Sequence, residues 1–258
     1  MVAQEYPVVT LLASPGNLGF AGGANAGVAR STTPWVLILN PDVQVTTTDV
    51  DRLLTGAAAT ESRVGAAGAR LVDARGATQA GFAVRRFPTL ATLAVDLLLV
   101  DKVWPGNPIS ARYLAQDVDL SATQDVEQPA AACLLVRREA FDAVGGFDAG
   151  YHPAWFEDVD FCRRLHTAGW RIRYIADAAP VHEGGVAMRS MGLGSFNQAW
   201  YRNMRRYVDR HFTVPARLTF RGLLVAGMVL RAGVSLVRGR LREAQAYLAV
   251  VPLAFDYA

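Results

Sequence analysis

Three carboxylates lie within four positions of the chain, in the stretch Trp155-Phe156-Glu157-Asp158-Val159-Asp160. Apolar residues then recur at the spacing of one helix face as far as Leu165, and Gly169 is typical of a helix end. The three acids are therefore predicted to lie in the first turn of a helix. Acids at that position often serve the helix itself, because they cap free N–H groups and face the positive end of the helix dipole. For Glu157 and Asp160 this structural role explains the residues as well as a chemical role does.

Asp158 is a stronger candidate for chemistry because two other polar residues follow predicted strands. Asp42 comes after the apolar run Trp35–Leu39, in Asn40-Pro41-Asp42, and His182 follows another strand. Ligands of open α/β sheets bind outside the carboxyl ends of strands, so these three side chains can converge on one site. A carboxylate and an imidazole there would suit a divalent cation that contacts phosphate oxygens. The structural alternatives are a turn aspartate after proline and a histidine without a ligand.

The composition describes an apolar globular protein. The chain has 258 residues, of which 52% are hydrophobic and 19% charged, enough for one large domain. A net charge of +3 gives no argument for a nucleic-acid partner. The only cysteines, Cys133 and Cys162, lie in apolar surroundings and predict buried thiols in a reducing compartment. The first residues lack the basic and apolar regions of a signal peptide, so a cytoplasmic location is expected.

The pattern of apolar runs predicts an α/β protein. Predicted strands cover 8–12, 35–39, 64–72, 129–136 and 170–175, and predicted helices cover 49–60, 137–144, a segment from 158, and 196–212. The run Trp35–Leu39 is expected to be a central strand buried on both faces. Strands that alternate with helices favour a Rossmann-like, mixed and mostly parallel sheet flanked by helices. The less regular region 81–128 is either an acceptor-binding insertion or an ordinary surface excursion.

A glycine-rich segment spans residues 15–27 and contains Asn17, Gly19 and Asn25. It does not fit G-x-G-x-x-G, and no G-x-x-x-x-G-K-[ST] loop follows, so the two common phosphate-binding loops are absent from the sequence. The segment is either a strand-to-helix turn or a helix N-terminus whose backbone approaches a nucleotide. The missing dinucleotide fingerprint also argues against a nucleotide-dependent oxidoreductase.

The C-terminal segment combines arginines with an apolar helix. A helix is predicted over 215–247, capped by Thr213, and five arginines fall within one narrow arc of it: Arg217, Arg221, Arg231, Arg238 and Arg242. No acidic residue lies between 217 and 242. The pattern is typical of an interfacial helix on anionic lipid, so residues 213–258 are interpreted as a basic amphipathic membrane-surface tail. The alternative is a core helix with a basic solvent-exposed face.

Taken together, the motifs resemble those of family 2 glycosyltransferases of the GT-A fold. They are Asn17-Leu-Gly-Phe-Ala-Gly-Gly-Ala-Asn25, Leu39-Asn-Pro-Asp42, Val144-Gly-Gly-Phe-Asp148, Phe156-Glu-Asp158 and His182. The chain is most similar to the rhamnosyltransferases that extend polyprenyl-diphosphate-GlcNAc, which share the Trp104-Pro-Gly-Asn-Pro108 type of segment and a basic tail. The resemblance implies a GT-A-like domain over residues 1–212 that works on the inner face of the cell membrane. It also implies inverting transfer of a sugar, expected to be rhamnose, from a dTDP- or UDP-sugar to a lipid-linked glycan in cell-envelope polysaccharide synthesis.

The resemblance further implies a role for each candidate residue. Asp158 matches the catalytic base, while Asp42 and His182 match ligands of a divalent Mg²⁺ or Mn²⁺ ion. Asn17, Gly19, Asn25, Asn40 and Asp42 belong to motifs expected to contact the nucleotide sugar, and Trp155, Phe156 and Glu157 are expected to hold the substrate. These residue types suit the reaction, since the attacking hydroxyl needs a carboxylate to take its proton and the leaving diphosphate needs positive charge.

The chain departs from the family at its N-terminus. Family members begin with two strands whose motifs grip the base and ribose, whereas this chain begins at what resembles the third strand. A start codon placed too late, a fragment or a remnant protein would each explain the difference, and the first two predict further N-terminal residues. A non-catalytic remnant that binds membrane or a partner enzyme is therefore the alternative to a glycosyltransferase.

Overall fold

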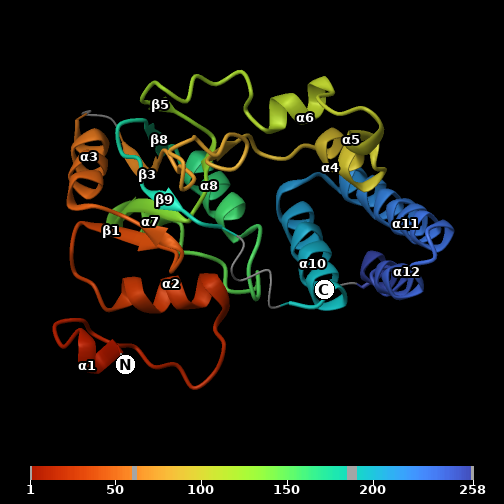
Figure 1. The fold of residues 1–258 in the computed structure, drawn as a ribbon, viewed down its shortest axis with the longest axis horizontal. Helices are drawn as coiled ribbons and strands as arrows, with labels where there is room; N and C mark the ends of the chain where they lie inside the picture. The colour runs from red at the N-terminus through yellow and green to blue at the C-terminus, as the bar shows by residue number, and fades with distance from the viewer. Residues whose placement is uncertain (1, 60–62, 185–190, 257–258) are drawn as a thin grey trace.

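The computed structural model describes residues 2–59, 63–184 and 191–256, which contain a five-stranded mixed sheet (Figure 1). In spatial order its strands are β1 (Trp35–Leu39), β7 (Cys133–Arg137), β3 (Val64–Ala69), β8 (Arg171–Ile175) and β5 (Gln124–Asp125). Strands β1, β3 and β8 share one direction, but β7 lies between β1 and β3 and is antiparallel to both. The predicted mixed α/β sheet is confirmed, with β3 and β8 as its parallel neighbouring pair.

Strand β1 is an edge strand of this sheet, so the prediction of a central position for Trp35–Leu39 is wrong. Within the described residues it pairs with β7 alone, and four of its five residues are at least partly exposed. Strand β7, which is buried from Cys133 to Val136, takes the inner position instead. An apolar run predicts a strand, but it does not show which neighbours flank that strand.

Helices cover both faces of the sheet. Helix α3 (Thr47–Ala58) packs on one face, and α2 (Gly19–Ala29), α7 (Arg138–Ala143) and α8 (Glu157–Thr167) pack on the other. Helix α3 begins with a capping box, in which the Thr46 hydroxyl accepts from Asp49 N and the Asp49 carboxylate accepts from Thr46 N. Helix α8 starts and ends where predicted, because Gly169 adopts the left-handed conformation (φ +77°) that closes it.

Two short strand pairs join distant segments beside the main sheet. Strand β2 (Val43–Gln44) pairs with β9 (Val181–His182), and β4 (Val84–Arg85) pairs with β6 (Gln128–Pro129). The first pair places Val43 opposite His182, and the second places Arg85 opposite Gln128. Residues that are far apart in the sequence are thereby brought to one end of the sheet.

A layer of helices extends from the sheet, on the right in Figure 1. It contains α4 (Leu90–Leu97), α5 (Val100–Val103), α6 (Pro108–Tyr113), α10 (Leu193–His211), α11 (Val214–Val237), α12 (Leu241–Leu248) and the 3₁₀ turn η1 (Val251–Ala254). A hydrophobic core connects α4, α10, α11 and the C-terminal turn through Leu97, Tyr207, Phe220, Leu224 and Val250. The C-terminal segment therefore shares a core with α4 and α10 instead of standing apart from the rest of the protein.

Two local predictions are wrong. Residues 8–12 form no strand: Val8 is 94% exposed, and no described strand pairs with the segment, which follows the short helix α1 (Val2–Glu5). The single helix predicted over 215–247 is divided into α11 and α12, because Gly239 (φ +70°) closes α11. Thr60, predicted to end the helix from 49, lies outside the described residues.

The arginine arc of the tail does not form an exposed basic face along α11. Arg217 donates to the Phe212 carbonyl, and the side chains of Arg221 and Arg231 lie 3.7 Å and 3.3 Å from the carboxylates of Asp209 and Asp96. These arginines face the protein because acids and carbonyl groups of neighbouring elements are available there. Helix α11 is also the one described helix long and apolar enough to cross a membrane by length and composition.

Candidate active site

Asp42 and His182, the two residues expected to hold a metal ion, form the first half of the candidate site. The β2–β9 pair brings them together, with His182 Nε2 3.6 Å from Asp42 Oδ1. Both side chains are largely buried, and Asp42 Oδ1 has no hydrogen-bond partner among the described residues. A buried carboxylate oxygen without a donor is costly, so this position suits a cation.

The surroundings of His182 favour a ring that can bind such a cation. Gln79 Nε2 donates to the His182 carbonyl at 2.8 Å, so its Oε1 faces His182 Nδ1 at 2.9 Å. The hydrogen bond to Oε1 requires a proton on Nδ1, and this leaves the lone pair of Nε2 directed toward Asp42. Phe82 stacks on the imidazole at 4.9 Å and fixes its plane. Outer contacts of this type orient metal-binding histidines in general.

This pair does not complete a metal site alone. No group of three or more His, Cys, Asp or Glu side chains suited to a metal occurs among the residues that the structure describes. Carboxylate oxygen and imidazole nitrogen are suitable ligands for Mg²⁺ or Mn²⁺, which commonly take their remaining ligands from water and substrate phosphates. The donor set of Asp42 and His182 therefore fits a cation that is bound together with a nucleotide diphosphate.

Asp158, the expected base, forms the second half of the candidate site. It is half-buried in the first turn of α8, where Gln128 Nε2 donates to its Oδ2 at 3.1 Å and Val159 N to its Oδ1 at 2.8 Å. Burial raises the pKa of the Asp158 carboxyl, while the Val159 amide and the charge of Arg85 act in the opposite direction. A raised pKa brings a carboxylate closer to the range in which it accepts protons efficiently.

The segment 79–85 connects the two halves. Its first residue, Gln79, contacts His182, and its last, Arg85, lies near Asp158. Between them Phe82 stacks on His182, and the Arg85 guanidinium lies 5.7 Å from the Phe82 ring. These contacts of Gln79, Phe82, Arg85 and Gln128 could not be predicted from the sequence, since none of the four residues belongs to a motif and each contact forms only on folding.

Three residues before Asp158 were expected to hold substrate. Trp155 is half-buried against Phe196 and Trp200, whereas Phe156 is 7% exposed and packs against Trp200 and Tyr207. Phe156 thus belongs to the core and offers no free ring face to a sugar. Trp155 and Phe156 both have positive φ angles, of 76° and 70°. Such strain in large residues is concentrated at functional sites and costs about 1–3 kcal/mol per residue.

Glu157 is buried beside Asp158 and differs from it in its contacts. Its Oε2 has no hydrogen-bond partner among the described residues. Burial, followed by the charge of Asp158, raises the pKa of the Glu157 carboxyl well above its usual range. A neutral carboxyl at this position can donate a hydrogen bond as well as accept one.

The glycine-rich segment is tied to the loop before α8. Asn17 Oδ1 accepts from Gly19 N, and a Cβ at Gly19 (φ +68°) would lie 2.7 Å from the Pro153 carbonyl oxygen. The amide of Asn25 donates to the Phe147 carbonyl and accepts from Phe147 N, so both its polar atoms hold this loop. Asn25 is therefore a structural clamp in this structure, in contrast to the expected nucleotide contact. Asn40, half-buried at the end of β1, binds Ala132 through its backbone N–H.

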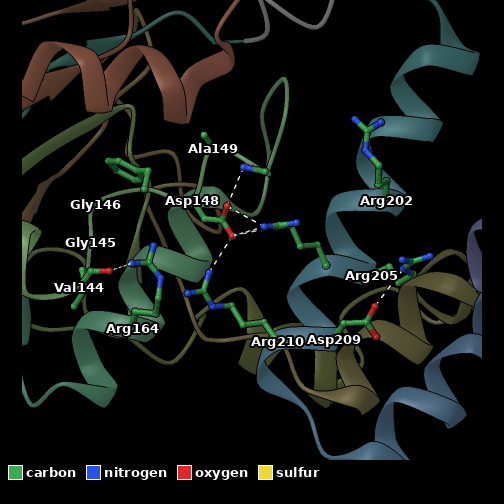
Figure 2. Close-up of a pocket in the computed structure, with 13 residues that line it drawn as sticks. Val144, Gly145, Gly146, Asp148, Ala149, Arg164, Arg202, Arg205, Asp209 and Arg210 are labelled. Atoms are coloured by element: carbon green, nitrogen blue, oxygen red, sulfur yellow. Dashed lines mark hydrogen bonds and ion pairs between the residues drawn. The ribbon is translucent and has the colours of Figure 1, made fainter. Parts of the chain in front are cut away.

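A separate cavity of about 820 Å³ lies between the loop 144–150 and α10 (Figure 2). Asp148 at its centre binds Arg206 and Arg210 at 2.9 and 3.0 Å, and these contacts hold the loop against α10. None of Asp42, Asp158 and His182 lines this cavity. Arg206 and Arg210 therefore serve the junction between the sheet and the helical layer.

Comparison with known proteins gives consistent family matches. Residues 1–144 match glycosyl transferase family 2, and residues 120–257 match glycosyl transferase family group 2. An N-acetylglucosaminyl-diphospho-decaprenol L-rhamnosyltransferase of Mycobacterium tuberculosis is 33% identical over 93% of this chain and 81% of its own length. Rhamnosyltransferase WbbL of Escherichia coli is 29% identical over 81% of this chain and 76% of its own length.

A solved structure gives a weaker match. The mannosyltransferase PcManGT of Pyrobaculum calidifontis, in complex with GDP-Man and Mn²⁺, covers 99% of this chain and 61% of its own, with 15% identity and a TM-score of 0.47. That similarity is too low to support an argument about ligands. Two family matches that each span more than half of the residues, with a relative 33% identical across 93% of the chain, show that this protein belongs to glycosyl transferase family 2 and is a glycosyltransferase.

Proposed function

We propose that this enzyme transfers rhamnose from a dTDP- or UDP-activated donor to a polyprenyl-diphosphate-linked glycan, as a step in cell-envelope polysaccharide synthesis. Two relatives are rhamnosyltransferases, which supports rhamnose as the sugar, and the name of one of them supports the lipid-linked acceptor. The observation that carries the proposal is the segment 79–85, which joins the Asp42–His182 pair to Asp158. A connected set of candidate residues favours an active enzyme over a non-catalytic remnant.

In the proposed reaction Asp158 is the general base. The acceptor hydroxyl oxygen attacks the anomeric carbon, its proton passes to the Asp158 carboxylate, and the bond from that carbon to the donor diphosphate breaks. Attack on the face opposite the leaving group inverts the anomeric centre. Gln128 orients the carboxylate through Oδ2, which leaves other lone pairs of the carboxylate to accept the proton. Trp155, in the loop before α8, and Glu157, at the start of α8, are proposed to hold the substrate beside this base.

Asp42 and His182 are proposed to hold a divalent Mg²⁺ or Mn²⁺ ion against the donor diphosphate. The unpartnered Asp42 Oδ1 and the Nε2 lone pair of His182 support this assignment. When bound, such an ion would neutralise the negative charge that develops on the leaving diphosphate. Gln79 keeps the His182 ring in the required orientation. Asn17 and Gly19 are joined by a hydrogen bond in the glycine-rich segment, and Asn40 is held at the end of β1 by its backbone hydrogen bond.

The lipid-linked acceptor implies that the enzyme works at the cytoplasmic face of the membrane as a peripheral protein. A direct test incubates the purified chain with dTDP-, UDP- and GDP-rhamnose and a polyprenyl-diphosphate-GlcNAc acceptor, followed by mass spectrometry of the lipid. We expect the lipid to gain one deoxyhexose, and we expect no product when EDTA is present. Absence of product with every donor, or full product formation by Asp158→Asn, would refute the proposed function.

A further inference from the structure

Helix α11 exposes an apolar face to the outside of the protein. Its exposed large side chains are Val214, Leu218, Val229, Leu230, Leu236 and Val237, with exposed fractions from 41% to 91%. At about 100° per residue these positions lie within one half of the helix circumference. The other exposed positions of α11 include Gly222, Ala226 and Gly233, and none of the exposed positions is charged. We call this half of the helix the apolar face of α11.

The opposite half of α11 contains its arginines. Arg231 donates to the Asp96 carbonyl at 2.6 Å, and the Arg221 guanidinium lies 3.7 Å from Asp209. The same half buries Phe220 and Leu224 against the helical core. A helix on the surface of a water-soluble protein normally has the reverse arrangement, with charged residues outside and apolar residues inside. Water is therefore an unfavourable medium for the outer half of α11.

A basic cluster lies at the C-terminal end of the apolar face. Arg238, Arg240 and Arg242 are all exposed around the turn between α11 and α12. Glu243 is the only acidic residue between 210 and 255 in the sequence. Positive charge beside an apolar face is complementary to a bilayer, in which anionic headgroups lie above acyl chains. An uncharged apolar protein surface would match the apolar face but not the basic cluster.

We propose that the apolar face of α11 inserts into the interfacial region of a lipid bilayer, with the helix parallel to the membrane plane. The basic cluster then contacts anionic headgroups. Contacts with α4, α12 and η1 hold the inner half of α11 along its length, so the helix lies on the membrane with the protein above it instead of crossing the bilayer. This inference rests on the proposed function, because it places the enzyme where a polyprenyl-linked acceptor resides.

Flotation of the purified full chain with lipid vesicles tests this inference. Vesicles of phosphatidylcholine alone and with phosphatidylglycerol, both without acceptor, are compared for wild type and for the triple variant Leu218→Glu/Val229→Glu/Leu236→Glu. We expect wild type to float with anionic vesicles and the triple variant to lose about tenfold or more of its binding. A matched variant, Val8→Glu/Val9→Glu/Leu11→Glu, alters apolar residues that are at least about as exposed but far from α11 in Figure 1, and it should bind as wild type does.

The basic cluster gives a second, separable result. Arg238→Gln/Arg240→Gln/Arg242→Gln should reduce binding to anionic vesicles and leave binding to neutral vesicles unchanged. The reduction should be clearest at low salt, because at physiological ionic strength the attraction to headgroups is screened within about 8–10 Å. Thermal melts of all variants check folding. The inference would be overturned if the triple glutamate variant floated as well as wild type does. It would also be overturned if wild type formed a dimer and bound no vesicles, while the triple variant was a monomer.

Transfer to a short-chain, detergent-dispersed acceptor separates this inference from the proposed function. If flotation is absent while transfer persists, only the membrane orientation is wrong. If flotation follows the apolar face while no donor supports transfer, the membrane inference stands and the proposed reaction is wrong.

Discussion

The two sides of the first turn of α8 give their carboxylates opposite environments. On the side of the sheet, Asp158 has a side-chain hydrogen bond from Gln128, and burial raises its pKa. On the side of α10, Asp160 is fully buried among Arg164, Arg210 and His211. Burial alone would raise the pKa of Asp160 too, but the hydrogen bond with His211 and the charges of the arginines lower it below its usual range.

This difference supports the proposed chemical role of Asp158 and a structural role for Asp160. A carboxylate enclosed by cations is held ionised and is a poor proton acceptor, whereas one with few partners and a raised pKa can take up a proton. Asp158 and Asp160 are two residues apart in the same turn, so the distinction comes from the elements packed on each side.

The largest expected effect is on the rate when Asp158 is altered. Asp158→Asn keeps the shape of the side chain but cannot accept the proton, so turnover should fall by about 10²–10⁴-fold, the usual contribution of a general base. Single-turnover transfer measures the rate, and a thermal melt should show an unchanged midpoint. Near-normal transfer by this variant, with a large loss in Glu157→Gln, would move the base to Glu157.

Asp160 should give the reverse result. Asp160→Asn leaves Arg164 buried without its charged partner, so the free energy of unfolding should fall by on the order of 3 kcal/mol. Because the folded-state pKa of Asp160 is lowered, its contribution is fully present above about pH 4 and is lost as the pH falls through the folded pKa. Denaturant unfolding measures the loss, with Asp51→Asn on the exposed side of α3 as control. A stable but inactive Asp160→Asn enzyme would contradict the comparison.

The Asp42–His182 half of the site extends the comparison to residues that act through their neighbours. Gln79→Leu removes the acceptor for His182 Nδ1, and loss of such an outer contact typically lowers metal affinity by about 10–100-fold. Mn²⁺ binding in the presence of a nucleoside diphosphate, followed by electron paramagnetic resonance, reports this directly. Gln79→Glu retains an acceptor and should recover most of the affinity, while Gln44→Leu on the exposed side of β2 should have no effect. If all three variants bind Mn²⁺ with equal affinity, Gln79 has no part in metal binding.

Local sequence signals predicted the parts of the site that depend on chain neighbours. The apolar spacing and Gly169 located α8, and the positions of Asp42 and His182 after strands predicted their convergence correctly. The roles of Gln79, Arg85 and Gln128 could not be predicted, because each side chain acts on a residue about 30 or more positions away. The same limit explains α11: helical periodicity places the arginines on one side, but only the position of Asp96 and Asp209 determines that this side faces inward.

The smallest expected effect concerns the pH dependence of the base. Ionised Asp158 is the active form, so kcat/KM should rise with pH as the carboxyl deprotonates. Burial raises its pKa, which places this rise above about pH 4, the ordinary range of aspartate. The positive charge of Arg85 favours the ionised form, so Arg85→Gln should move the rise to still higher pH while the rate at high pH changes less. Arg86→Gln is the matched control, because Arg86 pairs with Asp117 and Glu127 on the surface. If Arg86→Gln shifts the profile as much as Arg85→Gln does, the shift reflects the overall charge of the protein. A shift confined to Arg85→Gln would show that segment 79–85 adjusts the base as well as the histidine.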